Sequence, residues 1–261
     1  MKKSRSVRLN PIESEMSNSV AIVTGASRGI GRAVAVELAN LGCDLLINYR
    51  ASKDYAEQTA EIVRSVGSRA LVYRADVTRR EQVTAMLKVV LEEFGRLDML
   101  VNNIGLLYQK PFSEIDDDEW QNLIDVNLNS AFICTQEAGQ VMSDGGCIVN
   151  ISSIGGQIGG PKAPHYAAAK GALLTFTKSC ARLFAPRIRV NAVAPGFIRT
   201  DMFEHVREKS GQLEVEIADD IPMQRIGEPH EVAAAVGFLV SPRAGYITGH
   251  TLNVNGGIFM S

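Results

Sequence analysis

Tyr166 and Lys170 are four residues apart in the segment Tyr-Ala-Ala-Ala-Lys, at the start of a predicted helix. This separation places both side chains on one helix face. An isolated tyrosine has a pKa of about 10 and transfers protons poorly at neutral pH. An ammonium about 5 Å away, at an effective dielectric constant of about 20, would favour the phenolate by about 3 kcal/mol, or about 2 pK units. The pair could therefore serve as a general acid and base.

Two serines, Ser152 and Ser153, follow the apolar run 147–151, which is expected to be a strand. At the carboxyl end of a strand, either hydroxyl could hydrogen-bond a substrate carbonyl beside Tyr166. The surrounding Asn-Ile-Ser-Ser-Ile is not the Gly-x-Ser-x-Gly elbow of a serine hydrolase, which disfavours that class of enzyme.

A glycine-rich turn follows the first apolar run, in the segment Thr-Gly-Ala-Ser-Arg-Gly-Ile-Gly-Arg over residues 24–32. Gly25 allows a tight turn, Gly29 lets the backbone approach a phosphate, and Gly31 lets a helix pack close to the sheet. The free N–H groups at that helix start would bind a pyrophosphate. No Gly-Lys-Ser/Thr follows, which excludes a P-loop. The turn predicts a dinucleotide site.

The second apolar run indicates which dinucleotide binds. An NAD site places an acidic residue at the end of this strand, but here the strand ends Asn48-Tyr49-Arg50. Arg50, together with Arg28 of the glycine turn, could hold a 2′-phosphate by charge-assisted hydrogen bonds. The sequence therefore predicts NADP(H) rather than NAD(H).

The elements that must position these residues alternate along the chain. Short apolar runs without polar alternation, each followed by an amphipathic stretch, indicate a parallel sheet covered on both faces. The expected fold is α/β, a single Rossmann-type doubly wound domain of about seven parallel strands with helices on both faces. The apolar runs lie at 20–23, 44–47, 70–73, 99–101, 147–149, 189–193 and 251–254, and the helical patterns at 29–41, 53–66, 79–94, 117–142, 164–184 and 228–240.

Composition bounds the remaining function classes. The 261 residues include 27 Lys+Arg and 29 Asp+Glu, for a net charge of -2, so no basic patch predicts nucleic-acid binding. No apolar run is long enough to span a membrane, and the N-terminus lacks a secretory signal. The four cysteines form no Cys-x-x-Cys pair, so we predict no metal site and four buried thiols in a reducing cytoplasm. Residues 1–17 are expected to form a disordered or loosely docked tail, and 18–261 the catalytic domain.

Taken together, these motifs resemble the short-chain dehydrogenase/reductase family over residues 18–261. Further matching motifs are Asp76-Val77, Asn102-Asn103-Ile104-Gly105, Asn127 and Pro195-Gly196. The resemblance implies that Ser153, which lies thirteen residues before Tyr166, binds the substrate carbonyl, with Ser152 as the alternative. It further implies that Tyr166 donates the proton, that Lys170 lowers the tyrosine pKa and binds the nicotinamide ribose, and that Asn127 holds a proton-relaying water.

The resemblance also implies the cofactor contacts. Asp76 and Val77 would hold the adenine, and Asn103 and Gly105 would line the ribose side. A structural role is favoured for Asn102, and Asp76 could instead cap the next helix. The complete expected cofactor site is Gly25, Ser27, Arg28, Gly29, Ile30, Gly31, Tyr49, Arg50, Asp76, Val77, Asn103, Gly105, Tyr166, Lys170, Pro195, Gly196, Ile198 and Thr200.

Within the family, residues 191–202 and 246–257 are similar to 3-oxoacyl-acyl-carrier-protein reductases, which makes a 3-oxoacyl thioester the leading substrate. Such reductases place basic residues before the serine-bearing strand, where this chain has Asp144 and no Lys or Arg; Arg187 and Arg189 could supply part of a basic patch for an acyl carrier protein. Residues 201–227 are expected to form an apolar substrate lid. His165 is expected at the surface or in a supporting position behind the site.

Two other functions remain open. One is an NADP-linked dehydrogenase of a sugar, a polyol or a natural-product alcohol. The other, a non-catalytic dinucleotide-binding protein, is disfavoured because the complete set Asn127, Ser153, Tyr166 and Lys170 would be unnecessary for it. The resemblance implies a homotetramer, with the helices at 117–142 and 164–184 and the C-terminal strand at the interfaces.

Overall fold

The computed structural model describes residues 16–211 and 213–260. Residues 1–15 of the expected N-terminal tail lie outside the described residues. At the end of that predicted tail, Met16 is 1% exposed and packs into the core.

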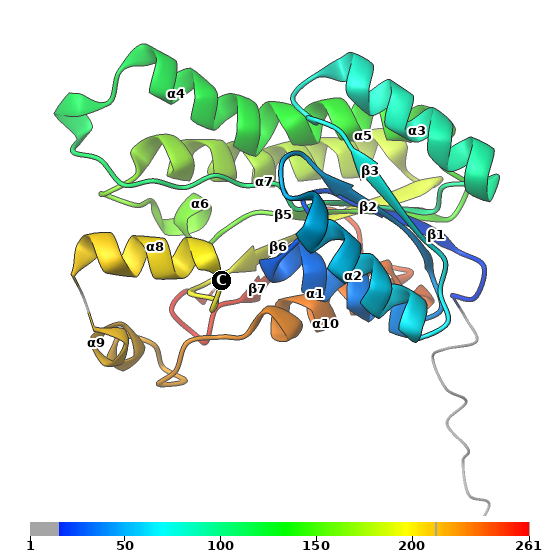
Figure 1. The fold of residues 1–261 in the computed structure, drawn as a ribbon. Helices are drawn as coiled ribbons and strands as arrows, with labels where there is room; N and C mark the ends of the chain where they lie inside the picture. The colour runs from blue at the N-terminus through cyan, green and yellow to red at the C-terminus, as the bar shows by residue number, and fades with distance from the viewer. Residues whose placement is uncertain (1–15, 212, 261) are drawn as a thin grey trace, which may run out of the picture.

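Seven parallel strands form one sheet in the order β3-β2-β1-β4-β5-β6-β7 (Figure 1). The order reverses between β1 and β4, so the crevice at their carboxyl ends is where a doubly wound sheet binds its ligand. Strands β1, β4 and β5 are buried along their whole length, which explains why the sequence shows no polar alternation there. The strands are β1 (Val20–Val23), β2 (Asp44–Tyr49), β3 (Ala70–Arg74), β4 (Met99–Asn102), β5 (Gly146–Ile151), β6 (Ile188–Pro195) and β7 (Thr251–Val254).

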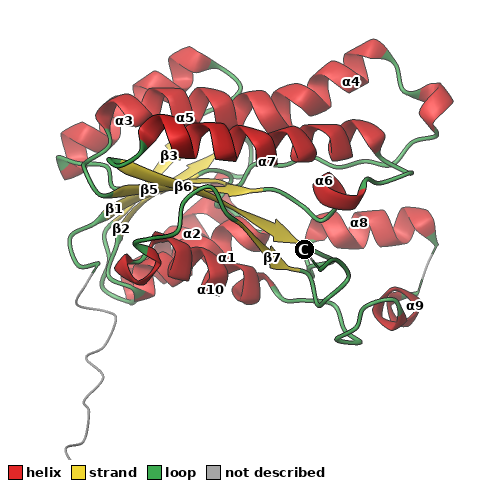
Figure 2. Cartoon of the chain, turned by 180° about the vertical axis from the view of Figure 1, so that it is seen from behind, coloured by secondary structure: helices red, strands yellow, loops and turns green. Residues whose placement is uncertain are grey.

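Helices cover both faces of this sheet (Figure 2). One face carries α1 (Gly29–Asn40), α2 (Lys53–Ser65) and α10 (Pro229–Val240), and the other carries α3 (Arg80–Phe94), α5 (Ser130–Val141) and α7 (Pro164–Phe184). Each layer encloses its own apolar core against the sheet. The predicted doubly wound α/β fold is confirmed.

The expected single helix over 117–142 is interrupted. It consists of α4 (Asp117–Ile124), a π-helical turn (Asp125–Asn129) and α5. A capping box between Asp116 and Glu119 starts α4. A π-helical turn contains one residue more than an α-helical turn, and such turns are frequent at functional sites. The interruption turns Asn127 into the protein interior, where it is 1% exposed.

Three helices that the sequence pattern did not predict lie beyond the carboxyl ends of the strands: α6 (Gly155–Ile158), α8 (Asp201–Ser210) and α9 (Glu214–Asp219) (Figure 1). Helices α8 and α9 pack on a small apolar cluster that is separate from the two main cores. Its buried residues are Phe203 of α8, Ile217 of α9, Ile221 and Ile226. Arg199 pairs with Glu214 and Glu228 at the base of this segment. Short 3-10 turns occupy Phe112–Glu114 and Pro242–Ala244.

The four cysteines are free and buried, as predicted, and burial raises the pKa of the Cys43 and Cys134 thiols to about 12. Among the described residues, no group of three or more His, Cys, Asp or Glu side chains could hold a metal ion. No helix in this part of the chain is long and apolar enough to cross a membrane.

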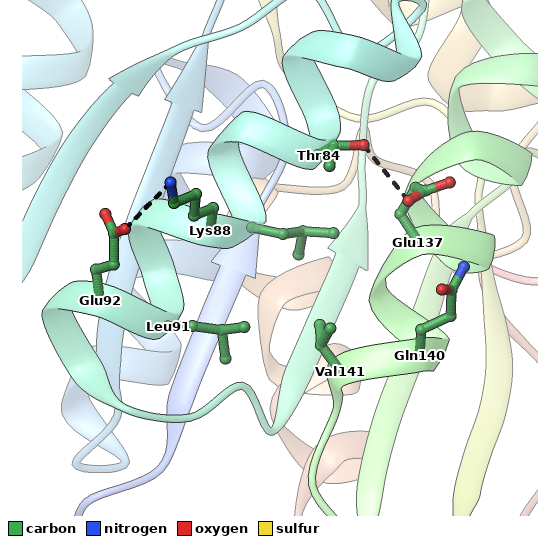
Figure 3. Close-up of a pocket in the computed structure, with 8 residues that line it drawn as sticks. Thr84, Lys88, Leu91, Glu92, Glu137, Gln140 and Val141 are labelled. Carbon is green, nitrogen blue, oxygen red and sulfur yellow. Dashed lines mark hydrogen bonds and ion pairs between the residues drawn. The ribbon is translucent and has the colours of Figure 1, made fainter.

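A surface groove between α3 and α5 is lined by Thr84, Lys88, Leu91, Glu137 and Val141, among others (Figure 3). None of its lining residues belongs to the predicted site, which lies at the carboxyl edge of the sheet. The groove is therefore separate from the site described next.

Candidate active site

The glycine turn between β1 and α1 has the backbone that a phosphate cradle requires. Gly25 and Gly29 adopt positive φ angles of 63° and 56°, which favour glycine. A Cβ on Gly31 would collide with the carbonyl oxygen of Gly25 and lie 2.5 Å from Asn103 Nδ2. Because Gly25 and Gly29 have backbone angles that disfavour a side chain and Gly31 has no space for one, the first turn of α1 can present its backbone N–H groups directly to a pyrophosphate.

Three polar side chains hold this turn in place. The Gly25 N–H donates to Asn48 Oδ1 at 3.2 Å, and Asn103 Nδ2 donates to the Thr24 carbonyl at 2.9 Å. Thr24 Oγ1 accepts from the Asn103 N–H at 3.0 Å. Sequence reasoning missed Asn48 and Thr24 as supports of the turn. The available signal was a polar side chain inside, or directly after, an otherwise apolar buried strand.

Arginines surround the adenosine end of the expected cofactor site. Arg50 follows β2, and its Nη1 lies 3.7 Å from Asp76 Oδ2. Arg74, at the end of β3, donates from Nε to the Arg50 carbonyl at 3.0 Å. Arg28 instead pairs with Asp201 at 2.9 Å. Tyr49 and Val77 are both buried. The arginines of this end, Arg28, Arg50 and Arg74, offer positive charge that fits a 2′-phosphate. The last residue of β2 is not acidic.

Asp76 forms a turn rather than a helix cap, because its Oδ1 accepts from the N–H and the hydroxyl of Thr78. Burial opposes ionisation, but the hydrogen bonds from Thr78 and the charges of Arg50 and Arg79 outweigh it and lower the Asp76 pKa below its ordinary value. The carboxylate is therefore ionised and held at the end of β3, beside the expected adenine position.

The end of β4 provides the opposite wall. Asn102 Nδ2 donates to Thr135 and to Asn150 at 3.0 and 2.8 Å, which ties the strands to α5 and agrees with a structural role. Gly105 brings the backbone close to two predicted catalytic residues, since a Cβ there would lie 3.3 Å from Asn127 Oδ1 and 3.5 Å from Lys170 Nζ. Gly105 therefore joins the cofactor crevice to the catalytic residues.

The two serines after β5 have different surroundings. Ser152 is 3% exposed, and its hydroxyl donates to the Lys170 carbonyl at 2.8 Å. Ser153 is half-buried, accepts from the Gly155 N–H at 3.1 Å, and hydrogen-bonds the Tyr166 hydroxyl. Ser152 therefore fixes α7 to the sheet, and Ser153 is the serine that faces the tyrosine.

Helix α6 packs directly on α7 through Gly155 and Gly156. A Cβ on Gly155 would lie 3.5 Å from Ser153 Oγ, and one on Gly156 would lie 2.5 Å from the Lys170 carbonyl carbon. This pair was not predicted, although two adjacent glycines shortly after the serines that follow β5 indicate a close backbone approach. The packing sets the position of Ser153 relative to Tyr166.

Lys170 is 2% exposed, and its Nζ donates to the carbonyl oxygens of Ile151 at 2.9 Å and Ile104 at 3.4 Å. Burial lowers the pKa of Lys170 to about 7. The Nζ atom lies 6.0 Å from the centre of the Tyr166 ring. The two side chains thus share one helix face, as their spacing predicted.

The expected electrostatic effect on Tyr166 is not what the structure shows. Burial raises the pKa of Tyr166, and the hydrogen bond with Ser153 offsets this only in part. A nearby Lys170 charge would by itself lower the tyrosine pKa, but the loss of water around the phenol acts in the opposite direction. Because burial also weakens the positive charge of Lys170 near neutral pH, the phenol remains protonated.

Asn127, in the π-helical turn, makes a two-way bridge to the backbone of Leu106. Its Nδ2 donates to the Leu106 carbonyl at 2.9 Å, and its Oδ1 accepts from the Leu106 N–H at 3.1 Å. The side chain therefore fixes the segment after β4 beside Gly105 and Lys170. The structure brings Asn127, Ser153, Tyr166 and Lys170 together at one edge of the sheet.

His165 does not lie at the surface. It is fully buried, and its ring packs edge-on against Tyr108 with 5.3 Å between ring centres. Burial lowers its pKa below the ordinary value. Tyr108, 57 residues away in sequence, covers this position, which helix periodicity alone could not reveal.

The end of β6 leads into the expected lid. The Gly196 N–H donates to the Val254 carbonyl at 2.9 Å, and a Cβ on Gly196 would lie 2.8 Å from Asn255 Cα. Ile198 pairs with Gly227 across the base of the lid. Thr200 caps α8 by accepting from the Phe203 N–H at 3.3 Å. Of the apolar residues expected in the lid, Phe203 and Ile217 are buried, whereas Leu213 and Val215 are exposed.

Arg187 and Arg189 do not form a free basic patch. Arg187 donates to the carbonyls of Gly139 and Met142 at the end of α5 and lies 4.0 Å from Asp144. Arg189 donates to the carbonyls of Leu239, Val240, Ser241 and Ile247 around the end of α10. Both guanidinium groups neutralise the negative ends of helices.

Comparison with known proteins is consistent with this geometry. The family model described as enoyl-(acyl carrier protein) reductase matches residues 25–259. The chain is 42% identical over 243 residues to 3-oxoacyl-acyl-carrier-protein reductase FabG of Staphylococcus aureus, covering 92% of this chain and 98% of that protein. It is 40% identical over 245 residues to the corresponding reductase of Synechocystis sp., covering 92% and 97%.

Solved structures share the whole fold. A short-chain dehydrogenase/reductase from Brucella melitensis, named glucose/ribitol dehydrogenase, superposes with a TM-score of 0.88 at 33% identity and covers 95% of this chain and 99% of its own. A blue fluorescent protein from a metagenomic library, solved in complex with NADPH, also gives a TM-score of 0.88, at 34% identity, with 94% and 100% coverage.

Proposed function

Since this chain belongs to the short-chain dehydrogenase/reductase family of NAD(P)-dependent enzymes, we propose that it reduces a ketone to a secondary alcohol with NADPH, and that its substrate is a 3-oxoacyl thioester. The observation that carries this proposal is the arrangement of half-buried Tyr166, which is hydrogen-bonded to Ser153 and whose ring centre lies 6.0 Å from the Nζ atom of buried Lys170.

The dinucleotide fits the residues present. The turn at Gly25, Gly29 and Gly31 has a backbone that side chains would strain or block and that leaves the first N–H groups of α1 for a pyrophosphate, and Arg28 and Arg50 supply charge for a 2′-phosphate. Ser27, Ile30, Tyr49, Asp76, Val77, Asn103, Gly105, Pro195, Gly196, Ile198 and Thr200 would complete its contacts. When bound, the nicotinamide supplies the hydride.

The protein side chains handle the carbonyl and the proton. Ser153 would donate a hydrogen bond to the substrate carbonyl and polarise it. Tyr166 would give its proton to the carbonyl oxygen as the negative charge develops there. Lys170 would stabilise the resulting phenolate. Asn127 would hold the Leu106 backbone in position, and thereby the segment after β4 that lines the site beside Gly105.

A thioester on an acyl carrier protein is supported by the names of the similar reductases. One observation favours the second candidate, a sugar, polyol or natural-product alcohol. Arg187 and Arg189, which could have met an acidic carrier, bond to helix ends, and Asp144 lies beside Arg187. A structural neighbour is also named glucose/ribitol dehydrogenase.

Assembly into a homotetramer is part of this proposal. Phe132 of α5 and Leu183 of α7, two helices in the layer on the same side of the sheet, expose 39% and 74% of their surface. Light scattering on the purified chain would give the number of subunits. A monomer at micromolar concentration would overturn this part of the proposal.

The activity is tested with purified protein, NADPH and two substrate panels. One panel contains acetoacetyl thioesters of pantetheine, coenzyme A and acyl carrier protein, and the other contains sugar and polyol ketones. We expect NADPH oxidation with the thioesters, measured by the loss of absorbance at the nicotinamide band. Oxidation only with the second panel would replace the thioester by the second candidate, and no oxidation with either would refute both substrates.

A further inference from the structure

The ion pair between Arg28 and Asp201 connects two parts of the chain that would meet the cofactor differently. Arg28 belongs to the glycine turn, and Asp201 is the first residue of α8, in the expected lid. Arg28 Nη1 and Asp201 Oδ2 are 2.9 Å apart. The two segments also touch beside this pair, because a Cβ on Gly29 would lie 3.4 Å from Thr200 Cγ2. The ion pair therefore lies where the glycine turn packs against the start of the expected lid.

Both members of the pair are well solvated, with 58% and 71% of their side chains exposed. An exposed ion pair contributes at most about 1 kcal/mol, so a stronger anion can replace the carboxylate. A phosphate dianion offers Arg28 more charge and more acceptor oxygens than Asp201 does. Asp201 remains stabilised without Arg28, because it lies in the first turn of α8 at the positive end of the helix dipole.

We propose that Arg28 exchanges partners: it holds Asp201 until a 2′-phosphate arrives, then binds that phosphate and releases the start of α8. This inference rests on the proposed use of NADPH. Asp201 then competes with NADPH but not with NADH, which has no 2′-phosphate. Asp201 is thus a specificity-determining residue, although it is distant in sequence from both arginines at the adenosine end.

Binding constants of NADPH and NADH, measured by nucleotide fluorescence in the absence of substrate, test the exchange. Asp201→Asn should tighten NADPH binding by about two- to fivefold, the range of an exposed ion pair, and leave NADH binding almost unchanged. Glu204→Gln is the matched control: it removes the same charge from the same first turn of α8, where Glu204 pairs with Arg207 instead of Arg28, and should leave the ratio of the two constants unchanged.

A double-mutant cycle separates this proposal from the proposed function. Arg28→Gln should weaken NADPH binding selectively, and Asp201→Asn should have no further effect on the NADPH/NADH ratio in that background. If Arg28→Gln leaves the ratio unchanged, the proposed role of Arg28 in NADPH selection fails. If Arg28→Gln acts as expected but Asp201→Asn shifts both nucleotides equally, only the exchange is refuted.

Hydrogen exchange reports the release of α8 directly. Adenosine 2′,5′-bisphosphate, which carries the 2′-phosphate but no nicotinamide, should accelerate amide exchange in the first turn of α8, where the Phe203 and Glu204 amides bond to Thr200. Adenosine 5′-diphosphate is the control and should not. In Asp201→Asn, exchange should already be fast and insensitive to the bisphosphate. Equal effects of the two nucleotides on the unmodified protein would overturn the exchange.

Discussion

The catalytic residues and the arginines of the adenosine end are held in opposite ways. Lys170 and Asn127 are buried, and each is bonded to backbone groups of neighbouring elements, while buried Ser152 fixes the helix that carries Tyr166 and Lys170. Arg28 and Arg50 are exposed, and each is paired with a single carboxylate. Proton transfer requires fixed distances and shifted pKa values, which burial supplies. Selection between two nucleotides requires only a modest difference in free energy, which solvated charges supply.

Replacing the phenol should have the largest effect. Tyr166→Phe should lower kcat by about 10²–10⁴-fold, because it removes the proton donor and the bond to Ser153. Nucleotide binding, measured by fluorescence, should remain within a few-fold of normal. Near-normal turnover of Tyr166→Phe in steady-state assays would contradict the prediction. The buried residues around Tyr166 would then not be the catalytic ones.

Lys170→Met should reduce kcat/KM by about 100-fold or more and yet stabilise the fold near neutral pH. The Lys170 pKa is about 7 in the folded state and near its ordinary 10.5 when unfolded, so the unfolded state binds more protons between these values. The stability of the normal protein relative to the variant therefore rises with pH, by about 1.4 kcal/mol per unit across this range.

Urea unfolding at pH 7, 8 and 9 would check this prediction. Lys178→Met, at an exposed position of the same helix, is the control and should show little such dependence. A stability difference that does not change with pH would contradict a buried, charge-penalised Lys170.

The glycine turn lies between the two regions and shares the rigidity of the first. In Gly31→Ala the new Cβ would meet the Gly25 carbonyl and Asn103. Overpacking of this kind costs about 1–3 kcal/mol of unfolding free energy and should weaken both nucleotides alike. The control is Gly160→Ala, because a Cβ on Gly160 has no atom within 4 Å and the residue does not have a positive φ. Equal stability of the two variants would show that the turn can relax.

Reversing a charge at the adenosine end should have the smallest effect. Arg50→Asp should raise the Kd of NADPH by about three- to tenfold, because the charge is exposed and screened, and leave NADH within about twofold. Arg50→Gln should fall between the normal protein and Arg50→Asp. An unchanged ratio of the two binding constants would remove Arg50 from nucleotide selection.

The sequence allowed the strands and most helices to be predicted to within a few residues, because buried parallel strands and amphipathic helices have clear periodicity. Helices α8 and α9 were not predicted, since their packing depends on a small cluster around Phe203 and Ile217 rather than on the main core. The π-helical turn was also missed, because one extra residue in an amphipathic stretch barely alters its pattern.

For the candidate site, residue positions were predicted better than their physical state. Tyr166 and Lys170 share a helix face as expected, but burial raises the first pKa and lowers the second. His165 is buried because Tyr108 covers it, and Arg187 is bonded to the end of α5. Each difference arises from contacts between segments far apart in sequence, which local spacing does not reveal.

The π-helical turn at Asp125–Asn129 makes this stretch intolerant of length changes. An α-helix rotates by about 100° per residue, so deleting one residue to restore a regular helix would turn either α4 or α5 by that angle. The apolar side of one helix, marked by Leu123 in α4 or by Cys134 and Ala138 in α5, would then face water. The number of residues in this stretch is therefore fixed by the packing of both helices at once.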